Sequence, residues 1–69
     1  MERTPVSSSN IAAIGYDSDS GVLEVEFTNG TVYSYSGVPT SEYDGFLNAD
    51  SKGKYFNGNI KNRYSFVKV

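Results

Sequence analysis

Two tyrosines, Tyr33 and Tyr35, stand two positions apart in the alternating segment Thr31-Val32-Tyr33-Ser34-Tyr35. Because successive side chains of a strand point to opposite faces, these two rings share one face. Exposed aromatic rings on a sheet can stack on splayed nucleic-acid bases, so the pair predicts a stacking platform. Tyrosine is also a common strand residue, and the alternative is that helices simply cover this face.

Charge is unevenly distributed along the chain. The net charge is -2, but residues 1–50 hold one arginine against all eight carboxylates, whereas residues 51–69 hold five basic residues and no acid. Such asymmetry can mark a surface for nucleic acid or for an acidic partner. The predicted nucleic-acid contacts are therefore basic residues of this segment together with the two tyrosines: Lys52, Lys54, Lys61, Arg63, Tyr33 and Tyr35. The alternative is that acidic and basic segments face each other in the fold or in a dimer.

The segment Ser51-Lys52-Gly53-Lys54 reads as the start of a helix, with Ser51 as its N-cap. Unpaired backbone N–H groups favour an anion at such a position, which predicts an anion-binding helix start at Ser51 and Gly53. Lys54 and Lys61 are seven residues apart and are expected on one face of this helix. Solvated lysines on a capped helix would give the same pattern.

Catalysis has little support in this composition. The chain has neither histidine nor cysteine, which removes the commonest general acid–base and the commonest thiol nucleophile. Asp17 and Asp19 weakly resemble the start of a calcium-binding EF-hand loop. Such a loop needs a glutamate at its twelfth position, and counting from Asp17 this position is Thr28. We interpret Asp17–Gly21 as a turn, and we expect no enzyme activity, no metal and no cofactor.

The clearest structural signal is a hairpin. Residues 22–28 alternate in polarity, Asn29-Gly30 follows, and residues 31–35 alternate again. A two-residue loop would pair Phe27 with Val32, Glu26 with Tyr33 and Glu24 with Tyr35. In that register both glutamates lie beside the tyrosines, where they would repel phosphate.

The rest of the chain completes one small domain, residues 1–69, with residues 1–8 as a loose lead-in. Residues 11–16 form a strand. Ser41–Asp44 resembles a capping box and starts a helix that ends near Asp50. A second helix is predicted over residues 52–63, with a core stripe of Phe56, Ile60 and Tyr64, and residues 64–69 form a fourth strand or a docked tail. The predicted fold class is α+β: a three-stranded antiparallel β-meander followed by two short helices packed on one face.

An ordered series of motifs resembles the KTSC domain, a family named for the C-terminus of some lysyl-tRNA synthetases and also present as stand-alone bacterial proteins. The motifs run over nearly the whole chain, from about Ser8 to Tyr64: Ile14-Gly15-Tyr16-Asp17, Tyr33-Ser34-Tyr35, Val38-Pro39, Ser51-Lys52-Gly53-Lys54-Tyr55-Phe56-Asn57, Ile60 and Tyr64. The resemblance implies a small α+β domain with no catalytic residues, and the synthetase context suggests RNA. Relatives often have arginine where this chain has Lys61, and lysine binds phosphate as a point charge.

These observations predict a small non-catalytic binding module whose partner is RNA, of a tRNA-like kind, held by a basic helix with support from tyrosine stacking. The alternative is a protein-interaction or homodimerisation module, either monomeric or weakly dimeric. No apolar run is long enough to span a membrane and no signal peptide is visible, so a cytoplasmic location is expected.

Overall fold

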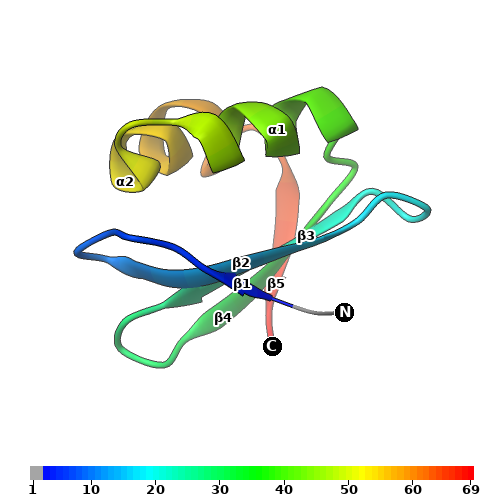
Figure 1. Ribbon diagram of the computed structural model, residues 1–69. Helices are drawn as coiled ribbons and strands as arrows, with labels where there is room; N and C mark the ends of the chain where they lie inside the picture. Colours follow the sequence, from blue (N-terminus) through cyan, green and yellow to red (C-terminus); the bar gives the residue numbers. More distant parts are fainter. Residues whose placement is uncertain (1–2) are drawn as a thin grey trace.

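A computed structural model describes residues 3–69. Five antiparallel strands form one sheet in chain order, and a layer of short helices between β4 and β5 covers one face of it (Figure 1). The elements are β1 Thr4–Pro5, β2 Ile11–Asp17, β3 Val22–Phe27, β4 Val32–Ser36, α1 Thr40–Asn48, α2 Lys52–Tyr55, the π-helical turn η1 Phe56–Ile60, and β5 Ser65–Lys68. The predicted α+β class with helices on one face is confirmed.

The sheet has more strands than the predicted meander. β5 confirms the strand expected near the C-terminus and pairs antiparallel with β4. The lead-in was predicted to be loose, and this was wrong for Thr4 and Pro5, which pair with Ile14 and Ala13 of β2. Proline is tolerated in β1 because this strand lies at the edge of the sheet. Met1 and Glu2 of the lead-in lie outside the described residues.

The register of the β3–β4 hairpin differs from the predicted one by one residue. Tyr33 lies opposite Val25 and Tyr35 opposite Leu23, so the predicted pairing of these tyrosines with glutamates is wrong. The loop contains three residues, because the amide N–H of Phe27 donates to the carbonyl of Thr31. A one-residue slip moves every side chain of a strand to the other face. The tyrosines therefore face the helices.

In this three-residue loop, Gly30 is the residue that turns the chain. Its amide donates to the carbonyl of Phe27, which closes a turn, and its φ of 90° lies in the region that favours glycine. No non-glycine residue among 3–69 has a positive φ, so Asn29 does not adopt the conformation that a type I′ loop would require. Asn29 instead accepts a hydrogen bond from the amide of Thr31 at its own side-chain oxygen.

The helices also depart from the predicted pattern. α1 begins at Thr40 with Pro39 as N-cap and has no side-chain cap, so the capping box predicted at Ser41 is wrong. The N-cap role of Ser51 is confirmed by its side chain, which accepts a bond from the amide of Lys54. The predicted helix over residues 52–63 changes to a π-helical turn at Phe56 and ends at Ile60. Two asparagines and a glycine within that turn are poor helix formers, which explains the early end.

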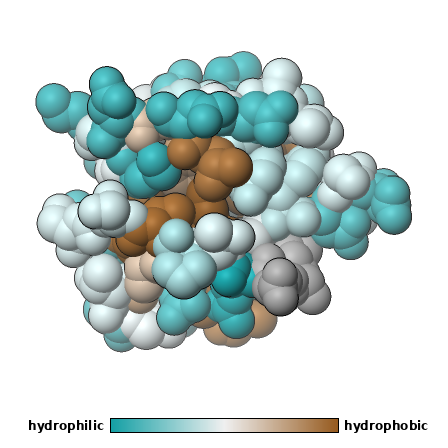
Figure 2. All heavy atoms as spheres, in the orientation of Figure 1, coloured by the Kyte–Doolittle hydropathy of each residue, from teal (hydrophilic) through white to brown (hydrophobic). Residues whose placement is uncertain are grey.

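The core lies between the helices and the sheet. It contains Ile11, Ile14, Leu23, Val25, Tyr35, Val38, Phe46, Phe56 and Ile60. The predicted stripe is confirmed for Phe56 and Ile60, while Tyr64 packs against the core and is half-buried. Figure 2, drawn in the orientation of Figure 1, shows brown apolar spheres where the helical layer meets the strands. One cluster of apolar side chains therefore joins the two layers.

Candidate nucleic-acid interface

Five aromatic side chains form a closed ring of contacts at one end of the core. Going round the ring, they are Phe27 of β3, Tyr33 of β4, Phe66 of β5, Tyr35 of β4 and Phe56 of η1. Neighbouring centroids are 5.3 to 5.8 Å apart, and four of the five contacts are edge-to-face. Edge-to-face packing is the favoured geometry of aromatic pairs. We call this group the aromatic cluster.

The aromatic cluster lines a cleft of about 510 Å³, which we call the aromatic cleft. Its other lining residues are polar or small apart from Ile11: Asn10, Asn29, Thr31, Gly53, Asn57, Lys61 and Asn62. No carboxylate lines it among residues 3–69. A concave apolar surface with a few polar groups is the usual form of a small-ligand site. Flat heteroaromatic rings suit such a surface, because they offer faces for stacking and edges for hydrogen bonds.

The two predicted tyrosines have different roles in the cleft. Tyr35 is 2 % exposed and belongs to the core, and its burial, with Tyr33 next to it, raises the pKa of its phenol. Tyr33 is half-buried, between Phe27 and Phe66. Of the predicted stacking pair, Tyr35 is thus covered, as the alternative expected, and only Tyr33 keeps an accessible ring. Tyr33 and Phe66, which is 52 % exposed, provide the accessible aromatic surface.

Glu24 and Glu26 lie on the opposite face of the sheet. Their Cα partners are Ser34 and Val32, so they point away from the helices and the cleft. Arg3 lies 3.7 Å from Glu24 Oε1 and 3.5 Å from Glu26 Oε1. The repulsion of phosphate that the predicted register implied is thus absent from the tyrosine face.

Lys61 reaches the cleft because of the π-helical turn. Its amide donates to the carbonyl of Phe56, five residues earlier, rather than four as in an α-helix. This wider turn changes the direction of the residues that follow it. Lys61 lines the aromatic cleft, whereas Lys54 lines a separate hollow, so the predicted common face of the two lysines is wrong.

The separate hollow, of about 310 Å³, is lined by polar residues and one glycine, and we call it the serine hollow. It is lined by Ser7, Ser8, Ser9, Asn10, Asp50, Ser51, Lys52, Gly53, Lys54 and Asn57. Three of these residues, Asn10, Gly53 and Asn57, also line the aromatic cleft. The two depressions are therefore neighbours with a common wall.

Lys52 and Arg63 have partners within the domain. The ammonium of Lys52 donates to the carbonyl of Ala49 at 2.6 Å, just after α1. The Arg63 guanidinium lies 3.3 Å from Glu42 Oε1 and 5.7 Å from the ring centroid of Tyr64. The structure gives these two basic groups structural contacts, whereas Lys54 and Lys61 have no ion pair among residues 3–69.

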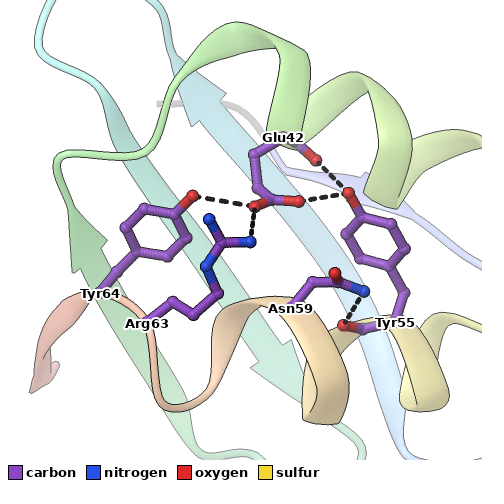
Figure 3. A network of polar contacts seen from close by, with 5 residues as sticks. All are labelled: Glu42, Tyr55, Asn59, Arg63 and Tyr64. Carbon is purple, nitrogen blue, oxygen red and sulfur yellow. Dashed lines mark hydrogen bonds and ion pairs between the residues drawn. The ribbon is translucent and has the colours of Figure 1, made fainter.

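Figure 3 shows the Glu42 contacts, which join α1 to the two segments that follow it. The Glu42 carboxylate accepts hydrogen bonds from the hydroxyls of Tyr55 and Tyr64 as well as from Arg63. The bond from Tyr55, together with its burial and the nearby charge of Glu42, raises the pKa of Tyr55 to about 12. Tyr55 ends α2, and Arg63 and Tyr64 lie between η1 and β5, so this network holds both of these segments against α1. Nothing in the spacing of these residues indicated it.

The predicted anion-binding helix start, at Ser51 and Gly53, belongs to a very short helix. α2 has four residues only, and the Ser51 side chain accepts from the amide of Lys54. Gly53 lies in the wall between the two depressions.

At the Asp17–Gly21 turn, Asp17 Oδ1 accepts a hydrogen bond from the amide of Asp19, which confirms the turn interpretation. Residues 3–69 contain no group of three or more acidic side chains placed to hold a metal ion.

The fold and cleft define a small α+β domain in which an antiparallel sheet carries short helices on one face. Residues 7–64 match the KTSC domain, and the chain belongs to this family. The crystal structure of a KTSC domain protein from Yersinia pestis superposes with a TM-score of 0.94 and 45% identity, over 99% of this chain and 96% of that one. The resemblance seen in the motifs is therefore confirmed.

Relatives occur both as small proteins and within a larger enzyme. A protein of Tsukamurella paurometabola is 43% identical over 63 residues, which cover 91% of this chain and 94% of its own. A lysine–tRNA ligase of Nostoc punctiforme is 40% identical over 59 residues, which cover 86% of this chain and 10% of the ligase. None of the helices within residues 3–69 is long and apolar enough to cross a membrane.

Proposed function

We propose that this domain is a non-catalytic module that binds single-stranded RNA and holds an unstacked base in the aromatic cleft. The observation that carries the proposal is the closed ring of aromatic contacts beside Lys61, in a cleft without a carboxylate. Stacking of a base on an aromatic side chain contributes roughly 1–3 kcal/mol. A neighbouring ammonium adds attraction for the phosphate that accompanies the base.

The rim of the cleft can also contact the edge of a base. Asn29 uses its side-chain oxygen within the loop, which leaves its NH₂ group available to donate. Asn57 and Asn62 offer both donors and acceptors at the rim. Sequence-specific recognition of RNA usually reads the edges of unpaired bases in this way. The amide-rich rim therefore supports a single-stranded partner rather than a duplex.

The occurrence of a related segment in a protein named lysine–tRNA ligase supports RNA over DNA. A module appended to an enzyme that acts on tRNA would meet RNA routinely. The polar serine hollow beside the cleft also offers hydroxyl and amide partners for a ribose 2′-OH, the group that distinguishes RNA from DNA.

Salt-dependent titration of a fluorescent single-stranded oligoribonucleotide tests the proposal, with the same sequence in DNA as a second arm. We expect binding that weakens with salt and is stronger for RNA. Lys61→Ala should lower the affinity and reduce the slope of log K against log salt by about 0.7, the value for one phosphate contact on a single strand. Arg3→Ala is the control, since Arg3 pairs with Glu24 and Glu26 on the opposite face of the sheet. Lack of binding at about 100 µM protein in low salt would exclude the function.

A second candidate is self-association or strand addition at β5. This strand lies at the edge of the sheet, and Phe66, Val67 and Val69 are 52%, 65% and 72% exposed. An exposed edge with apolar side chains can pair with another strand. Sedimentation equilibrium over a wide concentration range, with Val67→Lys as a disrupting variant, distinguishes this function. A monomer at all concentrations would count against it.

A further inference from the structure

Gly53 lies between two depressions of opposite character. The aromatic cleft on one side contains five aromatic rings, whereas the serine hollow on the other is lined by polar residues and Gly53. A nucleotide has the same division, because its base has flat apolar faces and its ribose and phosphate are polar. The two depressions therefore match the two halves of one ligand unit.

No contact within the domain requires glycine at position 53. Its φ lies outside the left-handed region, where only Gly21, Gly30 and Gly37 are found among the described glycines. A β-carbon there would meet only Asn10 Nδ2, at 3.8 Å, which is an ordinary contact. Glycine weakens a helix relative to alanine. The space above Gly53 is consequently open, and its backbone can be approached closely.

The chemistry of the serine hollow suits a phosphate with its ribose. Ser8 Oγ accepts bonds from the amides of Asn10 and Ile11, and Ser51 Oγ accepts one from Lys54. Because these oxygens act as acceptors in the bonds, each hydroxyl keeps its own O–H as a donor. Lys54 adds a positive charge that has no ion pair among residues 3–69, and Asp50 is the one carboxylate in the lining.

We infer that the serine hollow is the ribose-phosphate subsite next to the base site, and that Gly53 is the passage between them. This inference rests on the proposed function and extends it. One nucleotide places its base in the aromatic cleft, and its backbone crosses Gly53 into the hollow. Lys61 contacts the phosphate on the cleft side and Lys54 the phosphate on the hollow side. The smallest ligand that occupies the whole site is therefore a nucleoside that carries both a 5′- and a 3′-phosphate.

Chemical-shift titration of the full chain with four probes tests the inference: adenosine, a 5′-monophosphate, a 3′,5′-bisphosphate and a trinucleotide of RNA. Adenosine is expected to shift the resonances of the aromatic cleft only. The bisphosphate should also shift Ser8, Ser51 and Lys54, and should bind about tenfold more tightly than the monophosphate. Resonances of the Asp17–Gly21 turn, which lines neither depression, serve as an internal reference.

Gly53→Leu blocks the proposed passage, and Gly58→Leu is its matched control, because a β-carbon at Gly58 meets nothing within 4 Å and Gly58 lines neither depression. Both variants are expected to remain folded by circular dichroism. Gly53→Leu should lose at least tenfold in affinity for the bisphosphate while its affinity for adenosine stays the same, and Gly58→Leu should bind both like the wild type. Lys54→Ala should likewise weaken the bisphosphate alone.

The outcomes separate this inference from the proposed function. If RNA and adenosine bind the wild type but Gly53→Leu and Lys54→Ala bind the bisphosphate as tightly as it does, the serine hollow is not a subsite and the base site stands. If the bisphosphate binds as tightly as the trinucleotide, the subsite is supported and free nucleotide replaces RNA as the ligand. If no probe shifts the wild type, the RNA function fails and the subsite with it.

Discussion

The ring of Tyr55 lies against Gly45, so that a β-carbon at position 45 would be 3.1 Å from Tyr55 Cζ and closer still to the hydroxyl oxygen. Tyr55 also stacks on Phe46, with centroids 5.6 Å apart. The glycine that interrupts α1 is thus the place where the next helix approaches. A residue that weakens α1 on its own stabilises the packing of α1 against α2.

Gly45→Ala should therefore destabilise the domain, although alanine is the better helix former by about 1 kcal/mol. Displacing the Tyr55 ring corresponds to overpacking, which costs about 1–3 kcal/mol, so after the helix gain we expect a net loss of about 1–2 kcal/mol in the free energy of unfolding. Urea denaturation measures it. Gly58→Ala is the control, since the added methyl group meets open space, and it should be neutral or stabilising. Equal stability of Gly45→Ala and the wild type would contradict the packing argument.

The Glu42 network predicts a loss of stability in alkali. The hydrogen bond that the Tyr55 hydroxyl donates to Glu42 raises the pKa of Tyr55 from 10.0 to about 12 in the folded state. The neutral phenol is thus favoured by folding, and the unfolded chain releases this proton first as the pH rises. The contribution of Tyr55 to stability is complete below about pH 10 and is lost between pH 10 and about 12.

Tyr55→Phe should shrink this alkaline loss, because phenylalanine has no proton to release. Urea midpoints compared across the alkaline range measure the difference, and an absorbance titration of tyrosinate should show one late-titrating tyrosine fewer. An unchanged pH dependence in Tyr55→Phe would mean that the Glu42 contact does not hold the proton in solution.

Because the two hairpin tyrosines differ in burial, we expect their alanine variants to differ in stability and in RNA affinity. Tyr35→Ala empties a core position and should cost about 3–5 kcal/mol, which approaches the whole stability of a small domain. Tyr33→Ala should remain folded and weaken RNA binding by roughly 1–3 kcal/mol. Thermal unfolding and RNA titration of both variants provide the test. If Tyr35→Ala were the stable one, the β3–β4 register would have to be reconsidered.

The three-residue loop predicts that its glycine matters more than its asparagine. Gly30→Ala should destabilise by about 1–2 kcal/mol, since its φ of 90° is unfavourable for alanine although no atom lies within 4 Å of the added methyl group. Asn29→Ala loses only one exposed side-chain hydrogen bond and should cost about 0.5–1 kcal/mol. Equal large losses at both positions would instead indicate the two-residue loop, in which both residues need a positive φ.

Local patterns determined much of the architecture. Alternation located β3 and β4, the stripe of Phe56 and Ile60 located core residues, and Ser51 was recognisable as an N-cap because its role depends on residues three positions away. These features depend on short-range geometry that a sequence states directly. The α+β class and the KTSC family follow from the same local signals in order.

Tertiary packing decided the candidate site. Asn29-Gly30 allows a two-residue or a three-residue loop, and the choice depends on burial: only the longer loop places Tyr33 and Tyr35 beneath the helices with Leu23 and Val25. Each aromatic ring can bury about 150–250 Å², so the hydrophobic gain outweighs the local turn preference. The same packing closes the aromatic cluster from four separate elements and sends Lys61 into the cleft through a π-helical turn. Short-range patterns do not encode such long-range contacts, which is why the sequence by itself predicted the tyrosine pair but not the cleft around it.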